Sequence, residues 1–428
     1  MQKLFTEFTS TTAAQWKEQL VKDLKGIDYN TLVWQTNSGI DVQPFYTSEN
    51  LTTDPKPVFT SSDWAICEFI NVADEKTANA QALNALQNGA SGLVFSISKS
   101  INYSVLLKGI LLEHVYSLFR ISTDLYEELN TFLSKENCGD NCFIECDDLF
   151  SNHTSLKNKS SELCINTSLY QEAGSNAIHE IGFTLAHLNE YLDAASEIGR
   201  LKELKKIHIS MSVGGDFFME IAKLRALRKS IAFLLQQYAI QPVIHIHAQT
   251  TLINKSSIDS YNNMLRSTTE AMSASIGGAN SILVLPFDIE FNAQSDFSSR
   301  MARNQQLILK DESYLNVVAD MSAGSYYIET ITKTLCEKAW EQFKSIEAKG
   351  GLLACLKTNA IQELITKDAA TLIQQFKEGK LILVGINKFQ NKNEAPKGKG
   401  QQIMDIVPSS SGIKPIKLSD YFENQSAN

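Results

Sequence analysis

Between residues 61 and 310, short apolar runs alternate regularly with amphipathic patterns, and this alternation leaves few folds open. Short runs rich in Val, Ile, Leu and Phe are typical of strands that are buried on both faces of a sheet. Eight such runs occur, at 64–70, 92–97, 115–121, 142–146, 163–167, 207–213, 243–248 and 282–285. Apolar residues recur at helical spacing in most of the intervals, as at 77–87, 125–135, 177–201, 217–238, 260–276 and 297–309.

Eight strand–helix units in about 250 residues predict an α/β protein, a (β/α)8 TIM barrel that spans residues 61–310. A doubly wound open sheet is the alternative, because it is built from the same alternation of strands and helices. No G-x-G-x-x-G motif follows any of the eight apolar runs, which weakens this alternative in its dinucleotide-binding form.

Residues 1–60 precede the alternation and are predicted to form an extended N-terminal arm. Within it, the segment 13–24 has apolar residues at helical spacing, and the turn sequence TNSG at 36–39 lies between two short apolar runs, as in a hairpin. The arm also carries Trp34, Phe45 and Tyr46. A short hairpin with exposed aromatic residues is not expected to fold alone, so we expect the arm to contact another subunit.

The sequence after the barrel divides into two parts. Residues 311–390 are predicted to form a C-terminal helical extension, with helices at 328–349, 361–367 and 369–377. Residues 391–428 are polar and rich in lysine, and we expect them to form a tail without a core of its own.

The charge and hydropathy of the chain exclude some classes of function. The formal net charge of the 428 residues is -9, and an acidic surface argues against nucleic acid as the main partner. No apolar run reaches the roughly 18 residues that a membrane-spanning helix needs, and the N-terminus lacks the pattern of a signal peptide. We therefore expect a cytoplasmic protein that binds neither nucleic acid nor membrane.

Seven cysteines are spread along the chain, and Cys138, Cys142 and Cys146 recur every four residues. This spacing raises the question of a metal site, but zinc ligands usually come as two pairs and the sequence offers no second pair. The segment CFIEC at 142–146 also has the pattern of a buried strand. We therefore expect buried structural thiols and no metal.

The predicted strands carry polar side chains on one face. In the run 207–213, Ile207, Ile209, Met211 and Val213 share one face and the polar side chains share the other. The apolar faces should pack against the outer helices, so the polar faces should point into the barrel. Side chains predicted on such inner faces are Ser96, Ser98, His208, Ser210, Ser212 and His245.

A barrel interior is ordinarily filled by Val, Ile and Leu, so these serines and histidines require another explanation. One interpretation is a hydrated axis that a ligand occupies or once occupied. The other is a polar core whose hydrogen bonds are satisfied by protein groups and trapped water. The sequence alone leaves both open.

Several long segments resemble the methylmalonyl-CoA mutase family. They include DFFMEIAKLRALR at 216–228, HAQT at 247–250, YNNMLRSTTEAMSASIGGANS at 261–281 and DFSSRMARNQQLIL at 296–309. Upstream, GSNAIHEIGFTLAHLNEYL at 174–192 and DLKGIDYNTLVWQTNSGIDVQPFYT at 23–47 also match. The resemblance runs in order along the chain as far as VGINKF at 384–389.

The resemblance implies a TIM barrel and a role in the isomerisation of methylmalonyl-CoA to succinyl-CoA, a reaction of propionate metabolism. In that family, adenosylcobalamin supplies the radical chemistry. The pantetheine arm of the substrate threads the barrel axis, past small polar residues. By this resemblance the six inner-face residues above are candidates for lining a substrate channel.

The sequence also departs from the catalytic members of the family. It has no D-x-H-x-x-G motif of a cobalamin domain, no tyrosine in DWAICEFIN at 63–71, and no arginine in IHISMSV at 207–213. TLINKS at 251–256 replaces the glycine–tryptophan segment that follows HAQT in the family. His247 matches the family histidine that donates to the thioester carbonyl, but without the other groups we interpret His247 and Gln249 as relics and assign no catalytic residue.

These departures indicate the non-catalytic small subunit of a heterodimeric mutase, inactive alone. Its partner would be the large subunit, which carries the adenosylcobalamin, and this chain would bind no cofactor. The alternative is the substrate-binding half of a split acyl-CoA mutase whose cobalamin domain is a separate chain. An independent aldolase-like or lyase-like barrel enzyme is a further alternative, but it would need a Schiff-base lysine or a metal cluster at the strand ends, and Lys99 is the only lysine close after a predicted strand. A scaffold protein is another alternative.

Overall fold

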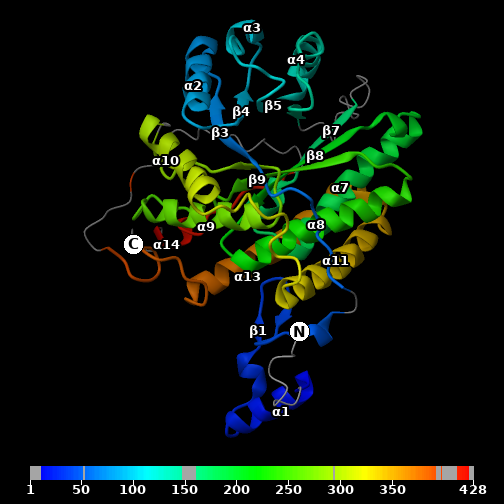
Figure 1. Cartoon of the computed structure of the whole chain (residues 1–428), viewed down its shortest axis with the longest axis vertical. Coiled ribbons are helices and arrows are strands. Elements are labelled where there is room, and N and C mark those ends of the chain that lie inside the picture. The colour runs from blue at the N-terminus through cyan, green and yellow to red at the C-terminus, as the bar shows by residue number, and fades with distance from the viewer. Residues whose placement is uncertain are drawn as a thin grey trace, which may run out of the picture.

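A computed structural model describes residues 11–51, 54–146, 161–292, 295–391, 397 and 412–423. Eight parallel strands form its centre, in the order β6-β5-β4-β3-β10-β9-β8-β7 (Figure 1). Their bounds are β3 Ala65–Asn71, β4 Gly92–Ile97, β5 Tyr116–Ile121, β6 Cys142–Cys146, β7 Glu162–Asn166, β8 Lys206–Val213, β9 Val243–Thr250 and β10 Ser281–Leu283. Each lies within two residues of a predicted strand at both ends.

The sheet is nearly closed into a barrel, so the predicted TIM barrel is confirmed and the doubly wound open sheet is wrong. The first and last of the eight strands, β3 and β10, pair in parallel, with Ala65 opposite Ser281. The two ends of the ladder, β6 and β7, lie beside each other without backbone pairing among the described residues. Across this seam the Asn166 Nδ2 donates to the Glu145 Oε1 at 2.8 Å.

Helices cover the outside of the barrel because each presents an apolar stripe to the outward faces of the strands. Several begin with a capping side chain; Asp74, for example, accepts from the Thr77 N–H at 2.8 Å. The outer helices are α2 Glu75–Gln87, α3 Tyr103–Leu106, α4 Tyr126–Leu133, α6 Ser168–Glu172, α7 Ala177–Glu197, α8 Phe217–Gln237, α9 Asn262–Ile276 and α10 Asp296–Leu307. Short 3-10 turns are η1 Tyr29–Leu32, η2 Ser48–Asn50, η3 Thr123–Leu125 and η4 Leu201–Glu203.

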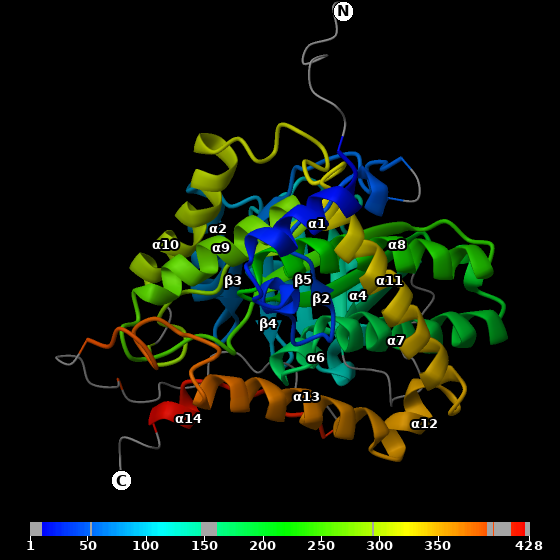
Figure 2. The ribbon, with the colours of Figure 1, turned by 90° about the horizontal axis from the view of Figure 1, so that it is seen from below.

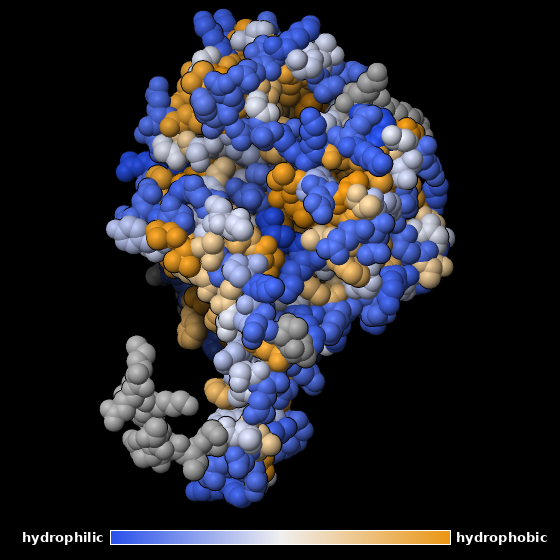
Figure 3. Space-filling view, turned by 45° about the vertical axis from the view of Figure 1, so that its right-hand side comes forward, coloured by the Kyte–Doolittle hydropathy of each residue, from blue (hydrophilic) through white to orange (hydrophobic). Residues whose placement is uncertain are grey.

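The N-terminal arm projects from the barrel as a narrow extension (Figures 1 and 3). It contains α1 Ala13–Asp23 and a hairpin of β1 Trp34–Gln35 with β2 Asp41–Val42, as predicted. The hairpin is anchored, because Val42 is buried in the main core and the Lys338 Nζ donates to the Gly39 carbonyl at 2.7 Å. By contrast, α1 has no buried residue.

The C-terminal extension begins with the π-helix η5 Ile308–Glu312 and continues through α11 Tyr326–Glu347, α12 Gly351–Lys357 and α13 Ala360–Lys377. The predicted break between 367 and 369 is wrong. Asp368 stays within α13 because its carboxylate has partners on α7, the Asn176 N–H at 3.0 Å and the His179 Nδ1 at 2.5 Å. Tertiary contacts of this kind override the low helix propensity of an aspartate.

A described part of the tail, residues 412–423 with α14 Asp420–Glu423, packs against α13 and the barrel (Figure 2). The Ile416 N–H donates to the Glu172 carbonyl at 2.8 Å, and the Leu418 N–H donates to the Ile253 carbonyl at 2.9 Å. These acceptors follow β7 and β9 in the chain. The segment therefore covers part of the carboxyl mouth, the end of the barrel at which the parallel strands finish. Among the described residues, no helix has the length and apolar character to cross a membrane.

Candidate functional site

Aromatic and imidazole rings fill the interior of the barrel. The Tyr116 ring stacks on the rings of His245, His247 and His208, with centroids 5.0, 5.8 and 6.1 Å away. Tyr116 fits there because its neighbour on β4 is Gly92, where an added Cβ would lie 3.0 Å from the tyrosine ring. These rings pack together with Phe143 and Leu283 in the barrel interior.

Hydrogen bonds join most of these rings. The Tyr116 hydroxyl lies 2.8 Å from the His208 Nε2, and the Ser281 hydroxyl lies 2.9 Å from the His245 Nε2 and 2.8 Å from the His247 Nδ1. Within the described protein, the His208 Nδ1 and the His247 Nε2 make no hydrogen bond. The polar-core interpretation therefore accounts for most of the inner face.

The three histidines are electrically neutral near pH 7. Burial lowers the pKa of His245 to about 3, and it lowers the pKa values of His208 and His247 far below their ordinary range. The positive charge of Arg120 adds to the effect at His208 and His247. A neutral imidazole can donate or accept a hydrogen bond, but these three do not act as cations toward a substrate.

A buried guanidinium lies in the interior. The Arg120 Nη1 donates to the Gln249 Oε1 at 2.8 Å, and its Nε lies 2.9 Å from the Glu145 Oε1. The side chains of Arg120 and Glu145 are only 7% and 1% exposed, so the ion pair is desolvated. Glu145 also accepts from the Ser210 hydroxyl and from Asn166. Since the carboxylate neutralises it, the guanidinium is not free to hold a substrate carboxylate.

Sequence reasoning missed Arg120. The signal was present, because strand alternation places Tyr116, Leu118 and Arg120 on one face of β5. A search for charged side chains on the inward face near the end of an apolar strand would have identified Arg120.

The structure places most of the predicted channel residues in one interior. His208, Ser210 and Ser212 are buried, and His245 is half-buried near the amino end. The Ser212 hydroxyl donates to the Glu172 Oε1 at 2.8 Å. The relic candidates His247 and Gln249 are also buried in the interior.

The other two candidates differ from each other. Ser96 is half-buried and lies on the same face of β4 as Val94, which packs with Tyr116 in the interior, whereas Ser98 is exposed beyond the strand. Ser98 is outside because β4 ends at Ile97, so strand alternation no longer fixes where its side chain points.

The carboxyl mouth holds a cavity of about 610 Å³ between the arm hairpin, the loops after β7, β8 and β9, and α13. Its lining includes Asp216, Glu180 and Glu220. Behind them the buried Lys223 Nζ lies 2.7 Å from Glu180 and 2.6 Å from Glu220. Burial raises the pKa of Glu180 to about 8 and that of Asp216 to about 6.

Among the described residues, no histidine lines this cavity. His179 is paired with Asp368, His187 lies on α7, His114 precedes β5, and the other described histidines lie inside the barrel. Among the described residues no group of three or more His, Cys, Asp or Glu is arranged to hold a metal ion. The cysteines, including Cys138, Cys142 and Cys146, are free thiols.

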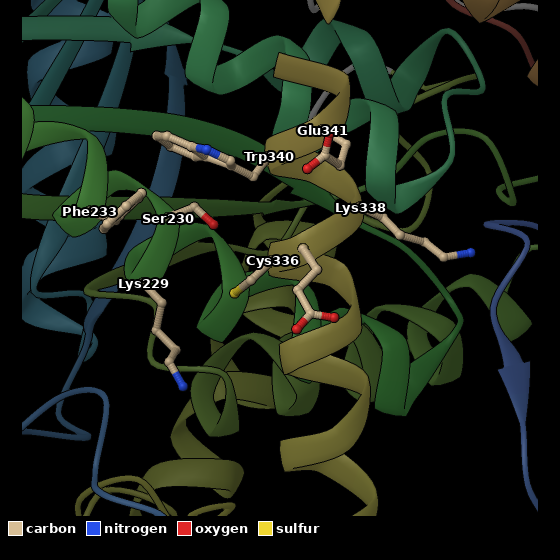
Figure 4. A pocket seen from close by; sticks show the side chains of 8 residues that line it. Lys229, Ser230, Phe233, Cys336, Lys338, Trp340 and Glu341 are labelled. Carbon is tan, nitrogen blue, oxygen red and sulfur yellow. The ribbon is translucent and has the colours of Figure 1, made fainter. Parts of the chain in front are cut away.

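A second hollow of about 610 Å³ lies on the outer surface between α8 and α11 (Figure 4). Its mostly apolar lining includes Phe233 and Trp340, whose ring centroids are 4.8 Å apart, and Cys336. Lys229 and Lys338 extend at its sides (Figure 4). It lies on the helical layer, outside the polar groups of the barrel interior.

Comparison with known proteins identifies the family. The family described as methylmalonyl-CoA mutase matches residues 141–410. The methylmalonyl-CoA mutase small subunit of Porphyromonas gingivalis is 34% identical over 98% of this chain and 76% of its own length. The small subunit of Streptomyces virginiae is 33% identical over 55% of this chain and 39% of its own. The large subunit of Streptomyces virginiae is 25% identical over 89% of this chain.

This chain spans 62% of the length of that large subunit, and about three quarters of the Porphyromonas gingivalis small subunit. The match to the latter extends over nearly all of the chain, arm and barrel together. The protein therefore belongs to the methylmalonyl-CoA mutase family.

Proposed function

We propose that this chain is the non-catalytic small subunit of a heterodimeric, adenosylcobalamin-dependent methylmalonyl-CoA mutase that acts in the cytoplasm. The large subunit would isomerise methylmalonyl-CoA to succinyl-CoA, and this chain would stabilise it. Two relatives named small subunit support this assignment.

The observation that carries the proposal is the filled barrel interior. A thioester arm passing along the axis would have to displace the Tyr116 ring and the imidazoles stacked on it. It would also meet Arg120, whose charge is already matched by Glu145. Removing either partner would leave an uncompensated buried charge, which disfavours such a rearrangement.

The cofactor belongs to the large subunit in this proposal. Adenosylcobalamin would supply the radical chemistry there, and the described part of this chain offers no histidine at the mouth to bind cobalt. Residues 412–423 instead cover the mouth beside β7 and β9.

The exposed surface of the arm is a second observation in favour of a partner protein. The helix α1 has no buried residue, and grouped apolar side chains on an exposed segment are typical of a surface that contacts another protein. The Trp16 and Phe45 rings lie 4.8 Å apart and form a small apolar surface.

The test is to express this chain and the large subunit separately and together, and to assay succinyl-CoA formation with added adenosylcobalamin. We expect turnover by the complex, none by this chain alone, and a lower thermal stability of the large subunit alone. Turnover by this chain alone would contradict the proposal, as would failure of the two chains to co-purify.

A second candidate is the substrate-binding half of a split acyl-CoA mutase. The burial of His247 and Gln249 in one interior favours it, because the His247 Nε2 makes no hydrogen bond within the described protein and a hydrogen-bond donor is what a thioester carbonyl requires. Mixing this chain with a free cobalamin-domain protein and methylmalonyl-CoA tests it. Turnover in that mixture would replace the first proposal with this one.

A further inference from the structure

The loop 314–321, between η5 and α11, exposes an unusual number of apolar side chains. Tyr314 is 67% exposed, Val317 70%, Val318 58% and Met321 36%. Scattered single apolar residues are normal on a surface, but four in eight consecutive positions form a patch of the kind found at protein interfaces.

The structure holds this loop in a fixed and strained shape. Tyr314 and Asp320, neither of them glycine, have φ values of 55° and 44°, and the loop follows directly on a π-helix. Asp320 is bound by the fully buried Arg225, whose Nη2 also lies 2.6 Å from the Glu329 Oε1. Strained backbone that is held by buried partners is typical of functional segments.

The loop is also joined to the base of the arm. The Val58 N–H donates to the Asp320 Oδ2 at 2.6 Å, and the Ser62 hydroxyl donates to the Val318 carbonyl. Figures 1 and 2 both show the chain between α10 and α11 passing beside the segment that leads from the arm to β3. The exposed side chains of the loop and those of the arm therefore belong to one side of the molecule.

We propose that the loop 314–321 is a docking surface for the large subunit, an inference that rests on the proposed function. The area needed supports this occupant. An obligate interface buries on the order of 2,000 Å² or more. The described part of the arm is a narrow projection with few exposed large apolar side chains, at Val21, Ile27, Leu32, Trp34 and Phe45. A partner that covers the arm down to its base must reach the loop that is bonded to that base.

The test uses the full chain co-expressed with the large subunit. The double substitution Val317→Glu with Val318→Glu should weaken the complex by a factor of about ten or more, because it places two charges in an apolar contact. Both side chains are exposed, so the fold should be unaffected, which circular dichroism and the melting temperature of the chain alone would check. Leu111→Glu is the control, since Leu111 is 64% exposed and lies in the segment between α3 and β5. The helix α3 is at the opposite end of the molecule from the arm (Figure 1).

A second variant gives a positive signal. A photo-crosslinking phenylalanine analogue at position 317 should form a covalent product with the large subunit, and the same group at position 111 should not. If the unmodified chains fail to associate, the proposed function fails. If they associate but the double variant binds equally well, or the crosslink joins two copies of this chain instead, the docking surface is wrong and the proposed function stands.

Discussion

At the scale of single residues, the Arg120–Glu145 pair explains why a polar interior is stable. Each charge is costly to bury, and the two offset each other while Gln249 accepts a hydrogen bond from Arg120 and Ser210 and Asn166 donate to Glu145. The Arg120 Nη2 has no hydrogen-bond partner among the described residues. The pair therefore fixes the arrangement of four strands, β5, β6, β8 and β9, and of β7 across the seam.

Glu145→Ala should lower the free energy of unfolding by about 3–5 kcal/mol, because it leaves the Arg120 guanidinium buried without a counter-charge. Urea denaturation of the isolated chain measures this. Glu18→Ala, which removes an exposed partner of Lys22, should cost less than about 1 kcal/mol. Replacing Arg120 and Glu145 together by leucine should recover most of the loss, and a double variant as unstable as Glu145→Ala would contradict this account.

The buried histidines predict a loss of stability in acid. In the unfolded chain each binds a proton below its ordinary pKa of 6.5, but in the folded protein the lowered pKa keeps it neutral. Unfolding therefore takes up protons as the pH falls from 6.5 toward 3. The free energy of unfolding should decrease over that range by about 1.4 kcal/mol per pH unit for each histidine, with full stability above pH 6.5.

Denaturation at several pH values between 7.5 and 5 measures this slope. His208→Gln should reduce it, and His114→Gln should leave it unchanged because the His114 side chain is 71% exposed. Equal slopes in the two variants would contradict the assignment.

The inner face shows what the sequence could predict at this scale. Alternation placed His208, Ser210 and Ser212 correctly because these positions lie in the middle of a long strand. It failed at Ser98, which lies past the end of its strand, and Arg120 was overlooked. The pairing of Arg120 with Glu145 could not be derived, since it depends on how neighbouring strands are staggered when the barrel closes.

At the scale of elements, strand positions were predictable because buried parallel strands are almost entirely apolar. Helix ends were less certain where tertiary contacts decide them. Asp368 would favour a break in an isolated helix, but its pairing with His179 keeps α13 continuous. No local pattern in the tail indicated that Leu418 would be buried against Ile253, because that contact joins segments far apart in the sequence.

Leu418→Ala tests the contribution of the C-terminal segment. Leu418 is only 2% exposed and packs with Phe376 and Ile253, so the substitution should lower the free energy of unfolding by about 2–5 kcal/mol. Limited proteolysis should also cleave α13 faster. Leu111→Ala, at a 64% exposed position, should change stability by less than about 0.5 kcal/mol. Equal effects of the two substitutions would show that the segment contributes little.

At the scale of the whole molecule, the chain is a barrel with an arm at one end and the helices α2, α3 and α4 at the other (Figure 1). The arm has two parts with different roles. Its hairpin is part of the main core through Ile40 and Val42, whereas α1 is not. The resemblance to one family predicted the fold and the lineage, and the sequence predicted the arm, but the exposure of the apolar side chains in the loop 314–321 is evident only in the structure.

Deleting residues 1–27 should therefore leave the melting temperature of the isolated chain unchanged, because α1 buries no residue. The same deletion should abolish or strongly reduce co-purification with the large subunit. Undiminished complex formation would exclude a role of α1 in binding. A lowered melting temperature would show that α1 supports the barrel after all.

The contacts of residues 416 and 418 with Glu172 at the end of α6 and with Ile253 after β9 have a consequence for biosynthesis. A chain leaving the ribosome folds from its N-terminus, so all eight strands are available before these residues emerge. The carbonyls of Glu172 and Ile253 therefore receive these hydrogen bonds only after the N–H groups of Ile416 and Leu418 have been synthesised. Maturation of the carboxyl mouth is therefore a late event, and a nascent chain arrested before residue 412 would present that mouth uncovered to chaperones.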